Sequence, residues 1–369
     1  MSRPAALLVG GTGPTGPHIA AGLEARGHTV TVLHTGGHEI DDVAHLEHLH
    51  ADVKSGAAVA EAIGDRTFDV AVVTYGRLRE IAEVLVGRVG QFLSVGGAPA
   101  YRGFFDAGRW DPAGMPVPTG EHAPKSDEGD DGKSYRVRRT EEAVFEHHPA
   151  ATHFRYPFVY GPRQPVPRDW YFVRRMLDGR DRIVVPDGGL TLMSSGYVEN
   201  LAHGLVLAVG NDRAAGEVFN LADREVLTLS QAGACCAAEL GVEVVFESIP
   251  WALAPCTRPL VGQDRTTHRV LDVAKAVERL GYTDVVPARE AVARTARWLV
   301  DHRPEPGGFE ERILEDPFDY EAEDHLLAWW DQAVASFADP YTARDEASPG
   351  YGLHYGGPGA SYQRPDTRI

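Results

Sequence analysis

The chain has 369 residues, of which 43% are hydrophobic, and a mean hydropathy of −0.25. A formal net charge of −17 opposes binding to nucleic acid, and no apolar run reaches the roughly 20 residues of a membrane helix. Three cysteines do not make a disulfide framework. Because the first apolar strand is predicted from residue 5 without a signal-peptide pattern, we expect a cytoplasmic protein with neither a membrane nor a nucleic-acid partner.

A glycine-rich turn, GGTGPTG at residues 10–16, lies between the first predicted strand and the first predicted helix. Residues 5–9 and 29–33 predict buried strands, and apolar residues at helical spacing lie between them. Glycine lets the backbone turn tightly and approach a pyrophosphate, while the helix N-terminus offers unpaired N–H groups to that anion. The pattern predicts a dinucleotide-binding unit; the other interpretation is a tight turn in an ordinary α/β domain.

Strands and helices continue to alternate up to residue 156. Further strands are predicted at residues 48–53, 68–73, 90–95 and 152–156, and helices at 57–63, 79–86 and 134–147. Such alternation predicts a parallel sheet with helices on both faces. The fold class that we expect is therefore α/β, a Rossmann-type doubly wound parallel sheet with a smaller mixed α/β C-terminal substrate domain.

Three regions are expected along the chain. Residues 1–162 form a Rossmann domain, 163–300 a mainly substrate-binding domain with returns to the first, and 301–369 an acidic helical extension with a tail rich in Gly, Pro and Tyr. The last region contains 15 acidic and 5 basic side chains, and a helix is predicted over 320–337. Residues 96–133, rich in Gly, Pro and acidic residues, are either an active-site loop or a disordered surface excursion.

Several motifs occur in the order found in one family. They are GGTGPTG at 10–16, DV at 52–53, YRVRR at 135–139, RYP at 155–157, YGPRQ at 160–164, YVENLA at 197–202, GEVFNL at 216–221, LDVAK at 271–275 and LGY at 280–282. Together they resemble the extended, here atypical, short-chain dehydrogenase/reductases, also called the NAD-dependent epimerase/dehydratase family. The resemblance runs from residue 5 to about residue 300.

This resemblance implies a Ser/Thr, a Tyr and a Lys beside the nicotinamide, of which Tyr135 is the acid/base. A cation four residues further along a helix lies on the same face and favours the phenolate of a tyrosine whose free pKa is near 10. Here that cation is Arg139, which keeps the charge but cannot shuttle a proton. The family's Ser/Thr position falls on Val95 or the glycines after it, so Ser94 is either catalytic or a buried strand residue.

The resemblance also implies a set of cofactor-binding residues. They are Gly10, Thr12, Gly13, Pro14, Thr15, Gly16, His34, Asp52, Val53, Thr74, Tyr75, Tyr135, Arg139, Tyr156 and Phe158. NAD-binding proteins commonly place a carboxylate at the end of the second strand, where this chain has His34. We therefore expect NADP or NAD, with NADP slightly favoured.

The predicted function is that of an NAD(P)-dependent oxidoreductase or epimerase. It would transfer hydride at a hydroxyl or carbonyl carbon of a small polar substrate, either sugar-like or a secondary metabolite. The alternative is a nucleotide-binding regulatory or scaffold protein that lost redox chemistry, because Lys is replaced by Arg139 and the usual Ser/Thr is absent. A homodimer is expected.

Two further groups of residues leave alternatives open or predict no site. Arg163, Arg168, Arg174 and Arg175 either recognise an anionic substrate group or face solvent. The spacing of His45, His48 and His50 invites a metal site, but no cysteine lies nearby to complete one, and no metal is expected.

Overall fold

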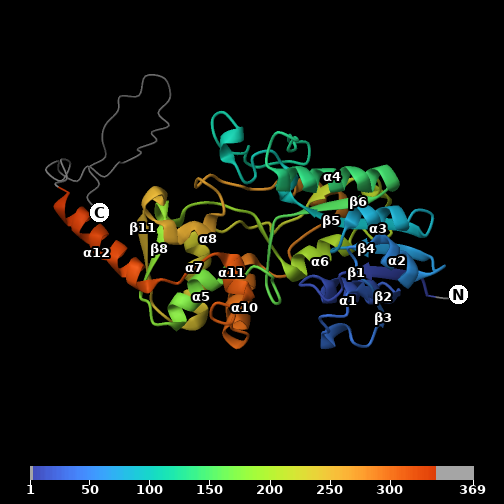
Figure 1. The fold of residues 1–369 in the computed structure, drawn as a ribbon, viewed down its shortest axis with the longest axis horizontal. Helices are drawn as coiled ribbons and strands as arrows, with labels where there is room; N and C mark the ends of the chain where they lie inside the picture. Colours follow the sequence, from blue (N-terminus) through green and yellow to red (C-terminus); the bar gives the residue numbers. More distant parts are fainter. Residues whose placement is uncertain (1–2, 338–369) are drawn as a thin grey trace, which may run out of the picture. The chain divides into compact units, whose positions relative to one another are not determined.

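The computed structural model describes residues 3–337 of the chain (Figure 1). Within the described residues, 3–318 belong to one compact unit, and a second unit begins at Asp319. The second unit contains α12 (Tyr320–Ser336), which begins where the Asp319 side chain accepts a hydrogen bond from the Ala322 N–H at 3.0 Å. The predicted Gly/Pro/Tyr tail lies outside the described residues. None of the helices within residues 3–337 has the length and apolar content that a bilayer crossing requires.

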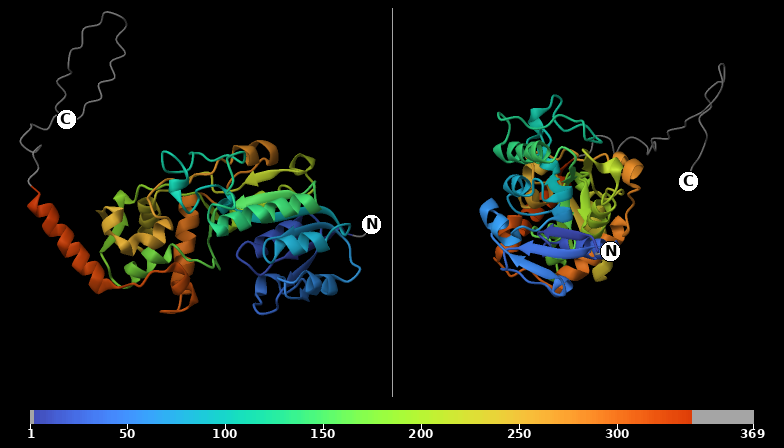
Figure 2. Two further views of the ribbon diagram at one scale, coloured as in Figure 1. Left: turned by 45° about the horizontal axis from the view of Figure 1, so that its top comes forward. Right: turned by 90° about the vertical axis from the view of Figure 1, so that its right-hand side faces the viewer.

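A parallel sheet organises the first unit, with strand order β10-β6-β5-β4-β1-β2-β3 within the described residues (Figure 1). Its strands are β1 (Ala5–Val9), β2 (Thr29–His34), β3 (Glu47–His50), β4 (Phe68–Val73), β5 (Val89–Gly97), β6 (Thr152–Tyr156) and β10 (Val218–Asn220). Each neighbouring pair is parallel, and the blue N-terminal strands lie side by side in Figure 2. The predicted doubly wound α/β fold is confirmed.

Both faces of this sheet are buried because alternate strand residues point to opposite sides. In β1, Leu8 belongs to one apolar cluster, whereas Leu7 and Val9 belong to another. The first cluster includes residues of α1 (Gly16–Ala25) and α6 (Val198–Val206). The second includes residues of α2 (Gly56–Ile63), α3 (Leu78–Val84) and α4 (Gly132–His147).

A third apolar cluster forms the core of the smaller part of the first unit. This part contains two small parallel sheets, β7 (Phe158–Tyr160) with β9 (Ser195–Tyr197) and β8 (Arg182–Pro186) with β11 (Val245–Ile249). Its helices are α5 (Trp170–Leu177), α7 (Leu229–Leu240), α8 (Arg258–Val261), α10 (Ala288–Asp301) and α11 (Phe309–Leu314). The chain re-enters the main sheet at β10, and α9 (Ala274–Leu280) follows later. Just before this helix, Leu271 is in a β-bridge with Thr119.

The segment between β5 and α4 packs against the unit at buried points. The Tyr101 hydroxyl donates to Asn220 Oδ1 at 2.7 Å, and the Ser126 hydroxyl donates to the Tyr101 carbonyl at 3.1 Å. The Thr119 N–H donates to the Val270 carbonyl at 2.7 Å. Tyr101, Thr119 and Ser126 are all at most 1% exposed, so this segment is not a loose surface excursion.

A buried ion pair fixes α4 to β6. Glu141 of α4 and Arg155 of β6 make a bidentate contact, Nε to Oε2 at 2.7 Å and Nη2 to Oε1 at 2.8 Å. The side chains are 3% and 2% exposed. Lys125 donates a further hydrogen bond to Glu141 Oε1 at 2.9 Å, and Arg155 also donates to the Glu121 carbonyl at 3.0 Å. These bonds offset the cost of removing both charges from water.

We expect Glu141→Ala to lower the free energy of unfolding by about 3–5 kcal/mol, because it leaves the Arg155 charge buried without its partner. Urea unfolding measures the loss. The matched control is Glu142→Ala, which removes a neighbouring carboxylate whose partner, Arg138, lies near the surface. That control should change stability by less than about 1 kcal/mol. Equal effects of the two substitutions would contradict the prediction.

Candidate functional site

The turn between β1 and α1 has a backbone path that requires glycine. Gly10 has a φ of +92°, and a Cβ there would lie 2.6 Å from Thr74 Oγ1. A Cβ on Gly16 would lie 2.1 Å from the carbonyl oxygen of Gly11. The helix therefore starts in direct contact with the turn, which brings its N-terminus to the carboxyl end of β1.

Two backbone N–H groups of this turn are available to a ligand. The N–H groups of Gly13 and Gly16 donate to the carbonyls of Gly10 and Gly13, at 3.1 and 3.0 Å. The N–H groups of Thr12 and Thr15 have no acceptor within residues 3–337. Free N–H groups at a helix N-terminus form an anion-binding site.

A cavity of about 630 Å³ opens at this turn. It is lined by Gly10, Thr12, Gly13, Pro14, Thr15, His34, Thr35, His38, Thr74, Tyr75, Val95, Gly96, Gly97, Pro99, Tyr156, Pro157, Val159, Arg163 and Pro165. The volume lies within the range of small-molecule sites, roughly 300–1,000 Å³. The lining follows the carboxyl ends of β1, β2, β4, β5 and β6, where doubly wound sheets bind their ligands.

Most of the predicted cofactor residues line this cavity. They are Gly10, Thr12, Gly13, Pro14, Thr15, His34, Thr74, Tyr75 and Tyr156. Gly16 is buried where α1 meets the turn. The Asp52 carboxylate accepts a hydrogen bond from the Lys54 N–H at 2.9 Å, and Val53 is buried with its carbonyl bonded to the Arg77 N–H at 2.9 Å. Neither of these two residues lines the cavity.

Sequence reasoning missed other lining residues, including Thr35, His38, Pro99, Val159 and Pro165. The signal for Thr35 and His38 was their position just after β2, because parallel strands bring their carboxyl ends to the same edge of the sheet. No local pattern marks the other three, which follow β5 or lie around β7 and are placed there by the fold.

Tyr135 and Arg139 lie together in the first part of α4 and outside the cavity lining. The Asp131 side chain caps this helix by accepting hydrogen bonds from the Lys133 N–H at 2.8 Å and the Ser134 N–H at 3.2 Å. Arg139 Nη1 is 3.5 Å from the Tyr135 hydroxyl, and the Arg139 side chain is 54% exposed. The predicted i, i+4 pair is thus adjacent in space, at the end of α4 that follows the 98–131 segment.

Ser94 lies inside the protein and does not line the cavity. It is 0% exposed, and its hydroxyl is 2.8 Å from Nδ1 of His153 on β6. The next residues of β5, Val95, Gly96 and Gly97, do line the cavity. A Cβ on Gly96 would lie 2.4 Å from His153 Nε2, so this histidine sits directly beneath the cavity wall.

Burial acts on the pKa values of two side chains behind this wall, Glu141 and His153. Burial raises the pKa of Glu141, but the hydrogen bonds and charge of Arg155 outweigh it and lower the value to about 2. Burial lowers the pKa of His153 to about 4, despite the Glu141 carboxylate at 3.8 Å. At neutral pH the structure therefore holds an ionised Glu141 and a neutral His153.

Comparisons with known sequences give partial matches. No known protein-family model matches the chain. The chain is 30% identical over 169 residues to the uncharacterized protein y4nL of Sinorhizobium fredii, covering 40% of this chain and 46% of that protein. It is 25% identical over 248 residues to the chloroplast stem-loop binding protein of 41 kDa b of Arabidopsis thaliana, covering 63% and 62%. The chain thus spans between about half and three fifths of the length of these curated relatives.

Solved structures match over most of the chain. An epimerase of Methanothermobacter thermautotrophicus has a TM-score of 0.64 at 16% identity, covering 82% of this chain and 93% of that one. UDP-glucose 4-epimerase of Thermotoga maritima, with UDP-glucose, has 0.64 at 18% identity, covering 81% and 99%. WbmG of Bordetella bronchiseptica, with NAD and UDP, has 0.63 at 16% identity, covering 82% and 96%. The chain has the fold of the NAD-dependent epimerases and dehydratases.

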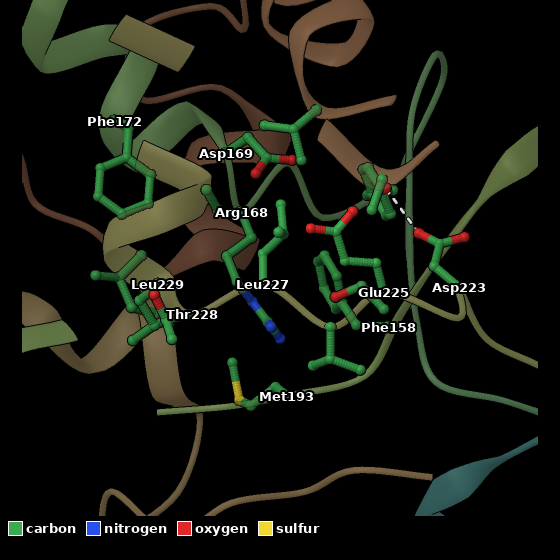
Figure 3. Close-up of a pocket in the computed structure, with 17 residues that line it drawn as sticks. Phe158, Arg168, Asp169, Phe172, Met193, Asp223, Glu225, Leu227, Thr228 and Leu229 are labelled. Atoms are coloured by element: carbon green, nitrogen blue, oxygen red, sulfur yellow. Dashed lines mark hydrogen bonds between the residues drawn. The ribbon is translucent and has the colours of Figure 1, made fainter. Parts of the chain in front are cut away.

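Within this epimerase/dehydratase fold, the chain has a second and smaller cavity of about 70 Å³ (Figure 3). Arg168 extends into it with its guanidinium 3.7 Å from the ring centre of Phe158. Its side chain has no hydrogen-bond acceptor within the described residues, and burial lowers its pKa to about 10. Burial also raises the pKa of Asp169 to about 6. Asp223 accepts hydrogen bonds from the Tyr160 hydroxyl at 2.7 Å and Asn200 Nδ2 at 2.8 Å.

The strand β7 separates the two cavities. Phe158 and Tyr160 line the smaller cavity, whereas Val159 lines the larger one, because alternate strand residues face opposite sides. Phe158 thus lies on the side of β7 away from the glycine turn. The smaller cavity is also well below the usual volume of a ligand site.

The four arginines singled out in the sequence have different surroundings. Arg175 is fully buried and pairs with Asp316 at 2.8 Å, and Arg174 contacts Glu311. These two therefore join α5 to the segment around α11. Arg163 lines the larger cavity and pairs with Asp42 at 2.6 Å, while Arg168 occupies the smaller one.

The histidine pattern at residues 45–50 does not come together as it reads in the sequence. His45 points to Glu24, with Nε2 3.2 Å from a carboxylate oxygen. His48 instead contacts His34 of β2, Nδ1 to Nε2 at 2.8 Å.

We expect acid to destabilise the protein partly through His153. Its pKa is 6.5 in the unfolded chain and about 4 in the fold, so between these pH values the unfolded state binds more protons. The full effect is about 3 kcal/mol. His153→Gln removes this titration. The free energy of unfolding, measured with urea at pH 7 and at pH 4, should therefore fall by about 3 kcal/mol more in the wild type than in the variant. A difference that does not change with pH would contradict the assignment.

Proposed function

We propose that the protein is an NAD(P)-dependent oxidoreductase or epimerase that transfers hydride at a hydroxyl or carbonyl carbon of a small polar substrate. The observation that carries the proposal is the glycine turn, whose free Thr12 and Thr15 N–H groups open into the cavity of about 630 Å³. The epimerase/dehydratase fold supports it, since the similar structures include complexes with NAD.

The residues around the cavity fit a dinucleotide. The N–H groups of Thr12 and Thr15 would hold the pyrophosphate. The end of β2, with His34, would face the adenosine ribose, and the end of β5, with Gly96 and Gly97, would face the nicotinamide. When bound, the nicotinamide would supply a hydride acceptor or donor.

The chain's own contribution to the chemistry is proton transfer. The Tyr135 phenolate would take the proton of the substrate hydroxyl as the carbon loses its hydride, and would return it in the reverse direction. Arg139, whose Nη1 lies 3.5 Å from the Tyr135 hydroxyl, would place a positive charge beside that oxygen and cannot itself deliver the proton. Both groups lie on α4, whose orientation the Glu141–Arg155 pair fixes.

NADP is the slightly favoured cofactor in this proposal, since no carboxylate occupies the last position of β2. The loop after β2 does bring one close, because Glu39 Oε1 lies 3.6 Å from His34 Nε2. Comparison of NADP and NAD affinities therefore decides the cofactor directly.

A second candidate is a nucleotide-binding regulatory or scaffold protein. It is favoured by Arg139 in place of the usual lysine and by the burial of Ser94, which leaves Val95 and two glycines at the cavity wall. Such a protein would bind the nucleotide without changing its absorbance in the presence of any substrate. One relative is named for stem-loop binding, but the net charge of −17 argues against RNA as the ligand here.

We expect Tyr135→Phe to abolish turnover, because it removes the only proton that the residue exchanges, while the affinity for the nucleotide stays within about twofold. Turnover is followed by the absorbance of the reduced nicotinamide with a panel of sugar nucleotides, alcohols and ketones. Nucleotide affinity is measured by calorimetry. Retained turnover in the variant would refute the role of Tyr135. Nucleotide binding without turnover in the wild type would favour the second candidate.

We expect Arg139→Lys to keep turnover and Arg139→Met to lower it at least about tenfold, because the proposed contribution is a positive charge beside the phenolate. Nucleotide affinity, measured by calorimetry, separates this from a structural effect and should stay within about twofold of the wild type in both variants. Equal turnover of the Lys and Met variants would contradict the electrostatic role.

A further inference from the structure

Four side chains with metal-ligand chemistry meet at the carboxyl ends of β2 and β3. The two strands pair in parallel with His34 opposite His50, and His48 lies two residues earlier on β3, on the same face. Glu39 from the loop after β2 completes the group. Its ligand atoms and those of the three histidines all lie within 4.8 Å of one another.

The distances centre on the Glu39 carboxylate. Its oxygens lie 3.6 Å from His34 Nε2, 3.7 Å from His48 Nδ1 and 3.1 Å from His50 Nε2. Four ligands at 2.0–2.1 Å from a tetrahedral ion are about 3.3 Å apart. The three distances lie on either side of this value. The His34–His48 contact, at 2.8 Å, has to open by about half an ångström to admit an ion.

Hydrogen bonds to the other ring nitrogens decide which lone pairs are free. His48 Nε2 lies 2.8 Å from the Val43 carbonyl, which only accepts, so this nitrogen carries the proton and Nδ1 keeps its lone pair. Such an outer bond orients histidines that ligate metals. For His34 Nε2 to offer a lone pair to an ion as well, its proton has to move to Nδ1. The Gly36 N–H, which lies 3.3 Å from Nδ1, then has to turn away. The adjacent glycines 36 and 37 give the loop this freedom.

We propose that His34, Glu39, His48 and His50 form a binding site for Zn²⁺. Three imidazoles and a carboxylate are ligands that Zn²⁺ accepts in tetrahedral geometry. The set comes from two strands and a loop, so the missing cysteine that argued against a metal site is not needed. His45, the first residue of the sequence pattern, is outside the site and pairs with Glu24.

An ion here would also change the charge at one end of the larger cavity, because His34 lines that cavity. Without the ion, Glu39 places a negative charge beside His34; with it, the local charge becomes positive. A positive charge at the end of β2 favours a nucleotide with a 2′-phosphate. This consequence, a Zn²⁺-dependent preference for NADP over NAD, rests on the nucleotide binding proposed above.

The test is a titration of the full chain with Zn²⁺ in competition with a coloured chelator. We expect one Zn²⁺ per chain, and an intense visible spectrum typical of tetrahedral coordination when Co²⁺ replaces it. The double variant Glu39→Gln/His50→Gln should bind Zn²⁺ more than about 100-fold more weakly. Both side chains are 54% exposed, so the substitutions leave the core intact. The matched control, His45→Gln, should bind like the wild type.

Absence of stoichiometric Zn²⁺ binding, or equal affinity of the double variant and the His45→Gln control, would overturn the site and leave a hydrogen-bonded histidine cluster. The nucleotide arm repeats NADP and NAD titrations with and without Zn²⁺. Stoichiometric Zn²⁺ binding with an unchanged nucleotide preference would overturn only the consequence for the cofactor. Zn²⁺ binding in a chain that binds neither nucleotide would count against the proposed function while supporting the metal site.

Discussion

The buried pair between Glu141 and Arg155 is the constraint on which the arrangement of the site depends. It joins the helix that carries Tyr135 to the strand that ends in Tyr156, a residue of the cavity wall. Lys125 extends the contact to the long segment before α4. Because both charges are removed from water, each is tolerated only while the other stays in place, so helix, strand and segment hold one relative position.

Two further buried polar residues, His153 and Ser94, explain which groups of β5 face the cavity. His153 is neutral and buried directly beneath Gly96, which leaves no room for a side chain there. Ser94 is engaged with that histidine from the interior side. The wall at the end of β5 therefore presents backbone and the Val95 side chain. The absence of a side chain at Gly96 and the packing of His153 are two aspects of one local arrangement.

The outer end of the same cavity depends on a different contact, between the strands β2 and β3. Their register places His34 opposite His50, and the loop between them returns Glu39 to the same point. Local spacing pointed to His45 in place of His34 and Glu39, because spacing within one strand says nothing about a neighbouring strand. The same limitation applies to β7, whose alternation sends Phe158 and Val159 to different cavities.

The sequence by itself determined the parallel α/β sheet, the order of its helices and the glycine turn. Each of these follows from local signals: strand and helix periodicity, and a backbone conformation that only glycine allows. It also placed Tyr135 and Arg139 on one helix face, since their spacing is a property of the helix itself. Only the tertiary structure decided that Ser94 is buried, that β7 divides two cavities and that His34, Glu39, His48 and His50 meet. These depend on strand register and on buried charge pairing, which join residues far apart in the chain.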